Sequence, residues 1–202
     1  LGLFTGMRRG EICGLRWSDI DFERSTITVN RTSEWLPHMG IVFTEPKTKA
    51  SNRTFKVGKH CFDMLKEYKL YQNGIRRKAG TAWAQTVQIE NEKTVQNDLL
   101  FTRWDGTPLD LNRVTTWFPK FMQEHDLPAV TVHSLRHTYA SLLIAAHVPI
   151  VTVAGRLGHA QTSTTTDIYA GFIKSADAAA SDTMDAVFDH IKQLKPDEAK
   201  QA

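Results

Sequence analysis

The sequence predicts an α+β fold that is mainly α-helical and carries a small antiparallel three-stranded sheet near the N-terminus. Three short runs rich in β-branched and aromatic residues lie between residues 25 and 57, separated by turn-forming residues. After residue 58 the apolar residues recur mostly at helical spacing. With 202 residues, of which 41% are hydrophobic, the chain can bury one core. We therefore expect a single domain over residues 1–202.

The first expected element is a short helix within GMRRGEICGLRW, where Ile12, Leu15 and Trp17 follow polar residues, and it ends in a turn at SDID. Strands follow, and their short, turn-separated pattern predicts antiparallel hairpins. The predicted strands are 25–30 (STITVN), 41–44 (IVFT) and 53–57 (RTFKV).

The second half of the chain is predicted to be helical. A helix begins near residue 59, with Cys61, Met64, Leu65 and Tyr68 on one face. Residues 72–98 are polar and show no clear period. A turn at DGTP then precedes NRVTTWFPKFMQEHDL, which predicts a helix broken or kinked near Pro119.

Two further helices follow. TVHSLRHTYASLL predicts a helix that starts near Ser134, and VPIVTVAGRLGH predicts a shorter one with Pro149 in its first turn and Gly158 near its end. The expected buried face of the first comprises Leu135, Tyr139, Leu142, Leu143 and Ala146. An apolar stripe over residues 174–195 predicts a C-terminal helix that packs either on its own domain or on a neighbouring protomer.

The composition limits the classes of protein to which this chain can belong. No run of 18 or more apolar residues occurs, so no membrane span is predicted. The two cysteines lie in unrelated contexts, which favours reduced thiols inside a cell over a disulfide framework. Residues 1–80 hold 15 lysines and arginines against 8 acidic residues, and residues 81–202 hold 10 against 14. A basic half is compatible with a polyanionic partner, although charge alone slightly favours ordinary surface solubility.

The stretch TVHSLRHTYASLL places His133 and Arg136 near one side of the first turn of a helix. Unpaired backbone N–H groups and the positive end of the helix dipole lie there too, which favours an anion such as phosphate. A zinc pair of His133 and His137 is the alternative. It lacks the glutamate of H-E-x-x-H, because position 134 is Ser134, and Arg136 would repel the metal, so no metal site is predicted. A capping His133 with a hydrogen-bonded His137 in the core is a third reading.

Three other stretches carry candidate functional residues. In TGMRRGE, Arg8 follows a glycine turn and Glu11 can orient it by a charge-assisted hydrogen bond, with Arg9 as the alternative. PKTKASNRTF is a basic, hairpin-like segment whose cationic residues can contact a DNA backbone; they are Lys47, Lys49 and Arg53. In GRLGHAQTSTTTDIYAGF, His159 follows a glycine turn and Tyr169 comes ten residues later.

Taken in order, these stretches resemble the tyrosine recombinases of the phage integrase family. The matching pieces are TGMRRGEICGLRWSDID, PKTKASNRTF, HSLRHTYASLL and LGHAQTSTTTDIYA. The resemblance implies that Tyr169 is the nucleophile, and that Glu11 supports an activating set of five residues. That set is Arg8, Lys47, His133, Arg136 and His159. Lys49 and Arg53 are expected to bind DNA, and choosing Lys47 over Lys49 depends on the hairpin register.

The resemblance also implies a reaction, namely cleavage and rejoining of DNA through a 3′-phosphotyrosyl intermediate, without metal or other cofactor. Expected partners are double-stranded attachment sites, other copies in a tetramer on DNA, and accessory bending or directionality proteins. We expect a cytoplasmic bacterial protein, an upstream core-binding domain, a monomeric isolated chain, and a C-terminal helix that docks in cis or in trans. A type IB topoisomerase and a non-catalytic DNA-binding regulator are the rival functions.

Overall fold

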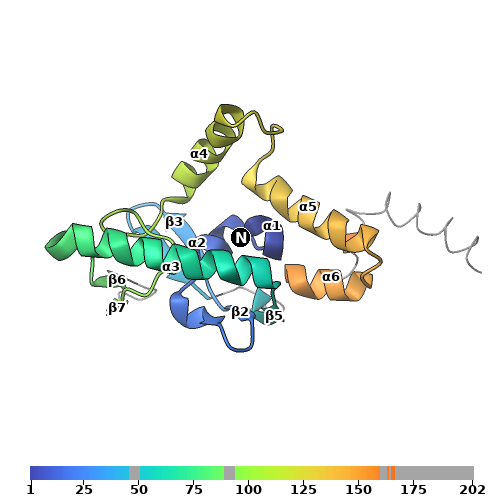
Figure 1. Cartoon of the computed structure of the whole chain (residues 1–202), viewed down its shortest axis with the longest axis horizontal. Coiled ribbons are helices and arrows are strands. Elements are labelled where there is room, and N and C mark those ends of the chain that lie inside the picture. Colours follow the sequence, from blue (N-terminus) through green and yellow to red (C-terminus); the bar gives the residue numbers. More distant parts are fainter. Residues whose placement is uncertain (46–50, 89–93, 160–162, 164, 167–202) are drawn as a thin grey trace, which may run out of the picture.

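The computed structural model describes residues 1–45, 51–88, 94–159, 163, 165 and 166. The helical part comprises α1 (Gly2–Thr5), α2 (Arg9–Gly14), α3 (Lys59–Ala79), α4 (Leu111–Glu124), α5 (Val132–Ala145) and α6 (Ile150–Leu157), with short 3₁₀ turns at Trp17–Asp19 and Gly80–Ala82. The strands are β1 (Ile20–Asp21), β2 (Thr26–Val29), β3 (Thr32–Leu36), β4 (Gly40–Thr44), β5 (Arg53–Lys56), β6 (Thr86–Gln88) and β7 (Thr94–Gln96). Figure 1 shows their arrangement.

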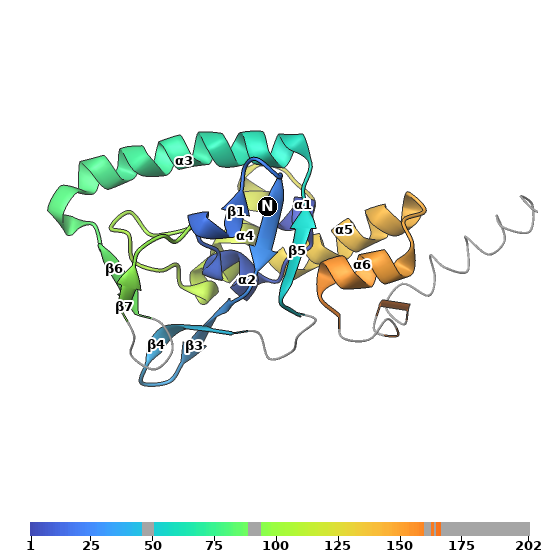
Figure 2. The ribbon, with the colours of Figure 1, turned by 90° about the horizontal axis from the view of Figure 1, so that it is seen from below.

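A three-stranded antiparallel sheet with the order β1-β2-β5 forms the centre of the fold, which confirms the predicted α+β class. Its inward side chains include Ile27, Val29 and Phe55, and they pack with Cys61 and Leu65 of α3 in the main hydrophobic core. In Figure 2, α3 extends from the end of β5 towards the β6–β7 hairpin. The alternation of buried and partly exposed residues along β2 matches a strand with one face on a core.

The composition of the sheet differs from the prediction. The segment at 41–44 does form a strand, but β4 pairs with β3 in a separate two-stranded sheet, and the short β1 takes the third place beside β2. Two residues give too short a pattern for β1 to be recognised in the sequence. The long β3–β4 hairpin continues past the sheet (Figure 2), where Trp35 is 53% exposed.

Helix α3 is longer than its apolar pattern indicates, because its last turns are polar and end in Arg76, Arg77 and Lys78, which suit the negative end of the helix dipole. Of the four residues expected on its buried face, Met64 is 45% exposed, while Cys61 and Leu65 are buried and Tyr68 packs at the edge of the core. The β6–β7 hairpin lies within the stretch for which no element was predicted.

The sequence predicts a break or a kink near Pro119; helix α4 is continuous across this residue, so it is not broken there. Asp110 caps the helix by accepting a hydrogen bond from the Asn112 amide at 2.8 Å. Only Leu111 and Met122 of α4 are buried, and Trp117 is 56% exposed. Figure 1 shows α4 projecting from the body of the molecule before the chain turns into α5.

Helices α5 and α6 form a second small core around Tyr139, Ala140, Val153 and Leu157. The predicted buried face of α5 is partly wrong: Leu142 and Ala146 are exposed, and Arg136 is buried instead. The reason is that α1 and the turn after it pack on this side of α5 and supply acceptors for the arginine. Of the described residues, no helix is long and apolar enough to cross a membrane. The predicted C-terminal helix at 174–195 lies outside the described residues.

Gly6 ends α1 in the left-handed conformation, with φ at 63°, and lies against the second core. A Cβ atom at this position would lie 2.4 Å from Cδ1 of Tyr139 and 2.8 Å from Cδ2 of Leu157. Both the backbone angle and the packing therefore require glycine here. The approach matters for function because the Gly6 carbonyl also holds a buried arginine.

Gly6→Ala should lower the free energy of unfolding by about 1–3 kcal/mol through overpacking and backbone strain. Urea unfolding followed by circular dichroism measures it. Gly74→Ala in α3 is the matched control, because a Cβ there meets nothing within 4 Å. We expect that variant to be more stable by up to about 1 kcal/mol. Equal stability of the two variants would contradict the packing of α1 on α5.

Candidate active site

A pocket of about 430 Å³ lies where the α1–α2 connection, α4 and the N-terminus of α5 meet. Three arginines line it, and among the described residues no acidic side chain does. The lining residues are Met7, Arg8, Arg9, Gly10, Thr115, Thr131, Val132, His133 and Arg136. Three of the predicted site residues, Arg8, His133 and Arg136, thus share one cavity, although Arg8 lies more than 120 positions before the other two.

Arg8 lies immediately before α2 in an extended conformation, and it is anchored at both ends. Its backbone amide donates to Oε2 of Glu11 at 2.7 Å, and its Nη1 donates to Oε1 at 3.0 Å. The side chain nevertheless remains 44% exposed. Glu11 therefore orients the guanidinium, as predicted, and leaves part of it open to a ligand.

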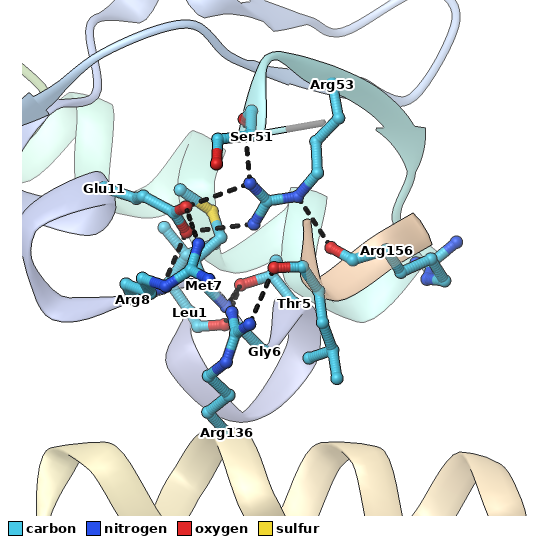
Figure 3. A network of polar contacts seen from close by, with 11 residues as sticks. Leu1, Thr5, Gly6, Met7, Arg8, Glu11, Ser51, Arg53, Arg136 and Arg156 are labelled. Carbon is cyan, nitrogen blue, oxygen red and sulfur yellow. Dashed lines mark hydrogen bonds and ion pairs between the residues drawn. The ribbon is translucent and has the colours of Figure 1, made fainter. Parts of the chain in front are cut away.

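Glu11 is itself buried and holds a second arginine, as Figure 3 shows. Arg53 donates from Nη1 to Oε1 at 3.0 Å and from Nη2 to Oε2 at 2.9 Å, a two-pronged pair. Burial alone would raise the pKa of Glu11, but the hydrogen bonds and charge of Arg53, together with Arg8, outweigh it and lower the pKa below its ordinary value. The carboxylate is therefore ionised at neutral pH.

Arg53 was predicted to bind DNA, but in the structure its side chain lies in the protein interior. Its side chain is 7% exposed. Besides Glu11, it bonds the Arg156 carbonyl of α6 through Nε at 2.7 Å and the Ser51 carbonyl through Nη1 at 3.0 Å (Figure 3). A guanidinium with all its nitrogens engaged has little capacity left for a phosphate. Arg53 acts instead as an internal brace that joins β5, α2 and α6.

Arg136 is 5% exposed and points from α5 to the connection after α1 (Figure 3). Its Nη1 donates to the Gly6 carbonyl and its Nη2 to the Leu157 carbonyl, both at 2.7 Å. Thr131 and Ser134 fix the start of the helix by a capping box, in which the Thr131 hydroxyl accepts from the Ser134 amide at 3.1 Å. The helix therefore presents Arg136 to the pocket in a fixed orientation.

His133 is exposed at the pocket, and its ring centroid lies 4.8 Å from that of His137, edge to face. Partial burial lowers the pKa of His133, and the charges of His137, Arg136 and Arg8 lower it further. His133 is therefore a neutral base at neutral pH when no anion is bound. Within the described ranges, no group of three or more histidine, cysteine or acidic residues is arranged to hold a metal ion.

His159 follows Gly158, which ends α6 in the left-handed conformation with φ at 70°. Its Nδ1 lies 2.7 Å from the hydroxyl of the fully buried Thr165. Burial lowers the pKa of His159 to about 4, with further contributions from the charges of Arg136, Arg8 and Arg53. The imidazole thus lies within electrostatic reach of the same arginines as His133.

The remaining predicted residues, Lys47, Lys49 and Tyr169, lie outside the described residues. Two contributors to the site went unrecognised in the sequence. Arg156 supplies the carbonyl that holds Arg53, and its own guanidinium donates to the Tyr139 hydroxyl and to the Lys56 carbonyl. Thr115 lines the pocket from α4. Neither has a local sequence signal, because each acts through residues distant in the chain.

The family model described as the phage integrase family matches residues 1–174. The chain belongs to the phage integrase family. It is 31% identical over 93% of its length to a XerC-like tyrosine recombinase of Caldanaerobacter subterraneus subsp. tengcongensis, covering 48% of that relative. It is 27% identical over 92% of its length to the ICEBs1 integrase of Bacillus subtilis, covering 47%. This family member spans about half the length of the curated relatives that it matches.

Solved structures show the same fold. The Tn1549 transposon integrase in complex with transposon right end DNA superposes with a TM-score of 0.70 at 23% identity, over 83% of this chain and 51% of that one. XerA recombinase superposes with a TM-score of 0.58 at 23% identity, over 83% of this chain and 50% of that one. The sheet and helices described above thus form the same fold as those two proteins.

Glu11→Gln should lower the free energy of unfolding at pH 7 by roughly 3–5 kcal/mol, because it leaves the buried Arg53 without its counter-charge. The pKa of Glu11 is lowered in the folded chain, so its stabilisation is complete above the ordinary value of 4.5 and is lost as the pH falls below it. The difference between wild type and variant should therefore shrink in acid. Urea unfolding at several pH values measures this.

The matched control for Glu11 is Asp63→Asn, which breaks the exposed pair of Lys59 and Asp63 in α3, with Nζ and Oδ2 2.6 Å apart. Exposed pairs of this kind contribute little, so we expect no measurable change. A Glu11→Gln variant as stable as Asp63→Asn at pH 7 would contradict the buried network.

The lowered pKa of His159 predicts that its imidazole is neutral at pH 7 and takes up a proton only near pH 4. Two-dimensional NMR of the imidazole resonances measures this in the DNA-free protein. We expect the His159 resonances to shift only as the pH approaches 4. A midpoint of His159 near 6.5 would contradict its burial beside the arginines.

Proposed function

We propose that this chain is the catalytic domain of a site-specific DNA recombinase that cleaves and rejoins DNA strands through Tyr169. The observation that carries the proposal is that Arg8, His133 and Arg136 line one pocket, in which no described acidic residue takes part. Family membership over residues 1–174 supports it. The printed names of relatives add support, since they include the ICEBs1 integrase and a transposase of Tn916.

The first requirement of the reaction is to neutralise the phosphodiester, because its charge repels a nucleophile. In the proposed mechanism Arg8 and Arg136 donate planar N–H groups to the nonbridging oxygens. Negative charge on those oxygens grows in the transition state, so fixed donors stabilise the transition state more than the ground state. The bonds of Arg8 to Glu11, and of Arg136 to the Gly6 and Leu157 carbonyls, supply the required rigidity.

The chemical step transfers phosphorus from one oxygen to another. The Tyr169 hydroxyl attacks the phosphorus, its proton passes to His133, and the bond from phosphorus to the 5′ oxygen breaks. Lys47 gives a proton to the departing 5′ oxygen, and the products are a 3′-phosphotyrosyl linkage and a free 5′-hydroxyl. His159 donates to a phosphate oxygen, which requires protonation or an Nε2–H tautomer. A 5′-hydroxyl from a partner strand reverses the step and joins the strands.

The proposed substrate is double-stranded DNA with attachment sites of a mobile element. The proposed assembly is a tetramer on two DNA sites, in which the 174–195 segment docks on a neighbouring protomer. Accessory bending or directionality proteins and a core-binding domain belong to the same proposal, as does action at the bacterial nucleoid. No metal or organic cofactor takes part, because side chains supply every charge and proton in the scheme.

A nicked suicide substrate tests the function, because loss of the short 5′-hydroxyl strand prevents rejoining and traps the covalent complex. The wild-type protein should give a protease-sensitive protein–DNA adduct on a denaturing gel, and Tyr169→Phe should give none. Tyr71→Phe is a matched control, since Tyr71 is a 65% exposed tyrosine of α3. Equal trapping by wild type and Tyr169→Phe, or trapping by neither, would refute the assignment. Plasmid relaxation without recombination would indicate a topoisomerase.

A further inference from the structure

Arg9 lines the same pocket as Arg8 but lies against α4. Its Nη1 donates to the Leu111 carbonyl at 3.2 Å and to the Thr115 hydroxyl. The Thr115 hydroxyl in turn donates to the Leu111 carbonyl at 3.0 Å. Within the part of the chain that the structure describes, Nε and Nη2 of Arg9 make no hydrogen bond. Arg9 is thus held in place through one nitrogen, and it retains two that can bind a ligand.

The pocket holds more positive charge than one phosphodiester needs. Arg8, Arg9 and Arg136 all line it, and the nearby carboxylate of Glu11 is already bound by Arg8 and Arg53. In the proposed reaction, Arg8 and Arg136 serve the scissile phosphate together with His133. No described carboxylate forms an ion pair with Arg9, which therefore contributes a further positive charge on the α4 wall. DNA supplies a matching charge, because phosphates follow one another every ~3.4 Å of helix axis along a strand.

We propose that Arg9, held in place by Thr115, forms a second phosphate subsite, which binds the phosphate next to the scissile one on the same strand. This rests on the proposed function, since the first phosphate defines the register of the second. Such a contact reads no base but fixes the position of the strand, so it places the scissile phosphate against Arg8 and Arg136. The bonds from Nη1 of Arg9 to α4 fix the guanidinium at the pocket and leave Nε and Nη2, which can together bind two phosphate oxygens.

A double-mutant cycle tests the subsite. It compares the binding of the wild-type protein and of Arg9→Gln to unmodified DNA and to DNA in which one phosphate at a time is replaced by a neutral methylphosphonate. Equilibrium binding is measured by fluorescence anisotropy over a range of salt concentrations. With unmodified DNA we expect Arg9→Gln to bind about tenfold more weakly. The slope of log affinity against log salt should fall by about 1. With the phosphate next to the scissile one neutralised, wild type and Arg9→Gln should bind equally.

The control for loss of charge is Arg24→Gln, since the Arg24 side chain is 84% exposed in the turn after β1. Any loss it causes should be the same on every modified DNA. A Thr115→Val variant keeps the Arg9 charge, and we expect a smaller loss that also disappears on the same neutralised DNA. If the loss caused by Arg9→Gln is the same whichever phosphate is neutralised, Arg9 only tethers α4 and the subsite is refuted.

Urea unfolding of each variant separates a fold defect from a binding defect. The binding cycle does not depend on cleavage, so it separates the two proposals. A specific coupling of Arg9 to one phosphate without trapping on the suicide substrate would overturn the recombinase function alone. Trapping by the wild-type protein without that coupling would overturn the subsite alone.

Discussion

The buried carboxylate of Glu11 is the interaction on which the rest of the site depends. It receives Arg8 from the start of its own helix and Arg53 from β5, and Arg53 continues to the carbonyl of Arg156 in α6. One anion thus joins α2, the central sheet and the second helical core. A buried ion is costly unless it is paired and hydrogen-bonded, and here both oxygens are bonded to arginine. Loss of this one group would release several elements together.

The same arrangement explains how the pocket remains positive. Glu11 is buried and forms ion pairs with both Arg53 and Arg8. It therefore orients Arg8 without cancelling the positive charge of the pocket walls. Arg136 is oriented by neutral carbonyls of Gly6 and Leu157 instead, which adds no negative charge. Burial is the main cause of the lowered pKa values of His133 and His159, and the neighbouring cations add to it because they disfavour imidazolium. A bound phosphate would oppose the contribution of the cations.

The second structural constraint is the close approach of α1 to α5. Gly6 permits it, because any larger residue would meet the Tyr139 ring. That approach brings the Gly6 carbonyl to Arg136 and the start of α2, with Arg8 and Arg9, to the N-terminus of α5. The apolar contacts and the polar site are therefore consequences of the same packing. Helix α4 is joined to this point by Arg9, which completes the pocket wall.

Much of this protein was readable from local patterns. Strand alternation at 25–30 and 53–57, helical spacing after residue 58, and the glycine turns before Arg8 and His159 all have short-range physical causes. The order of the motifs was enough to identify the family. The pairing of Arg8 with Glu11 was also predictable, because the two residues are three apart at the start of one helix.

Only the tertiary structure decided which residues far apart in the chain contact one another. Arg53 was expected on a DNA-facing hairpin, yet it binds Glu11, 42 positions away. Strand 41–44 pairs outside the central sheet, and the polar Arg136 replaces Leu142 on the buried side of α5. The local sequence around an arginine in a basic segment is the same whether its side chain contacts solvent, DNA or a buried carboxylate. Its role depends on which acceptors packing brings within hydrogen-bond distance, and no local pattern contains that information.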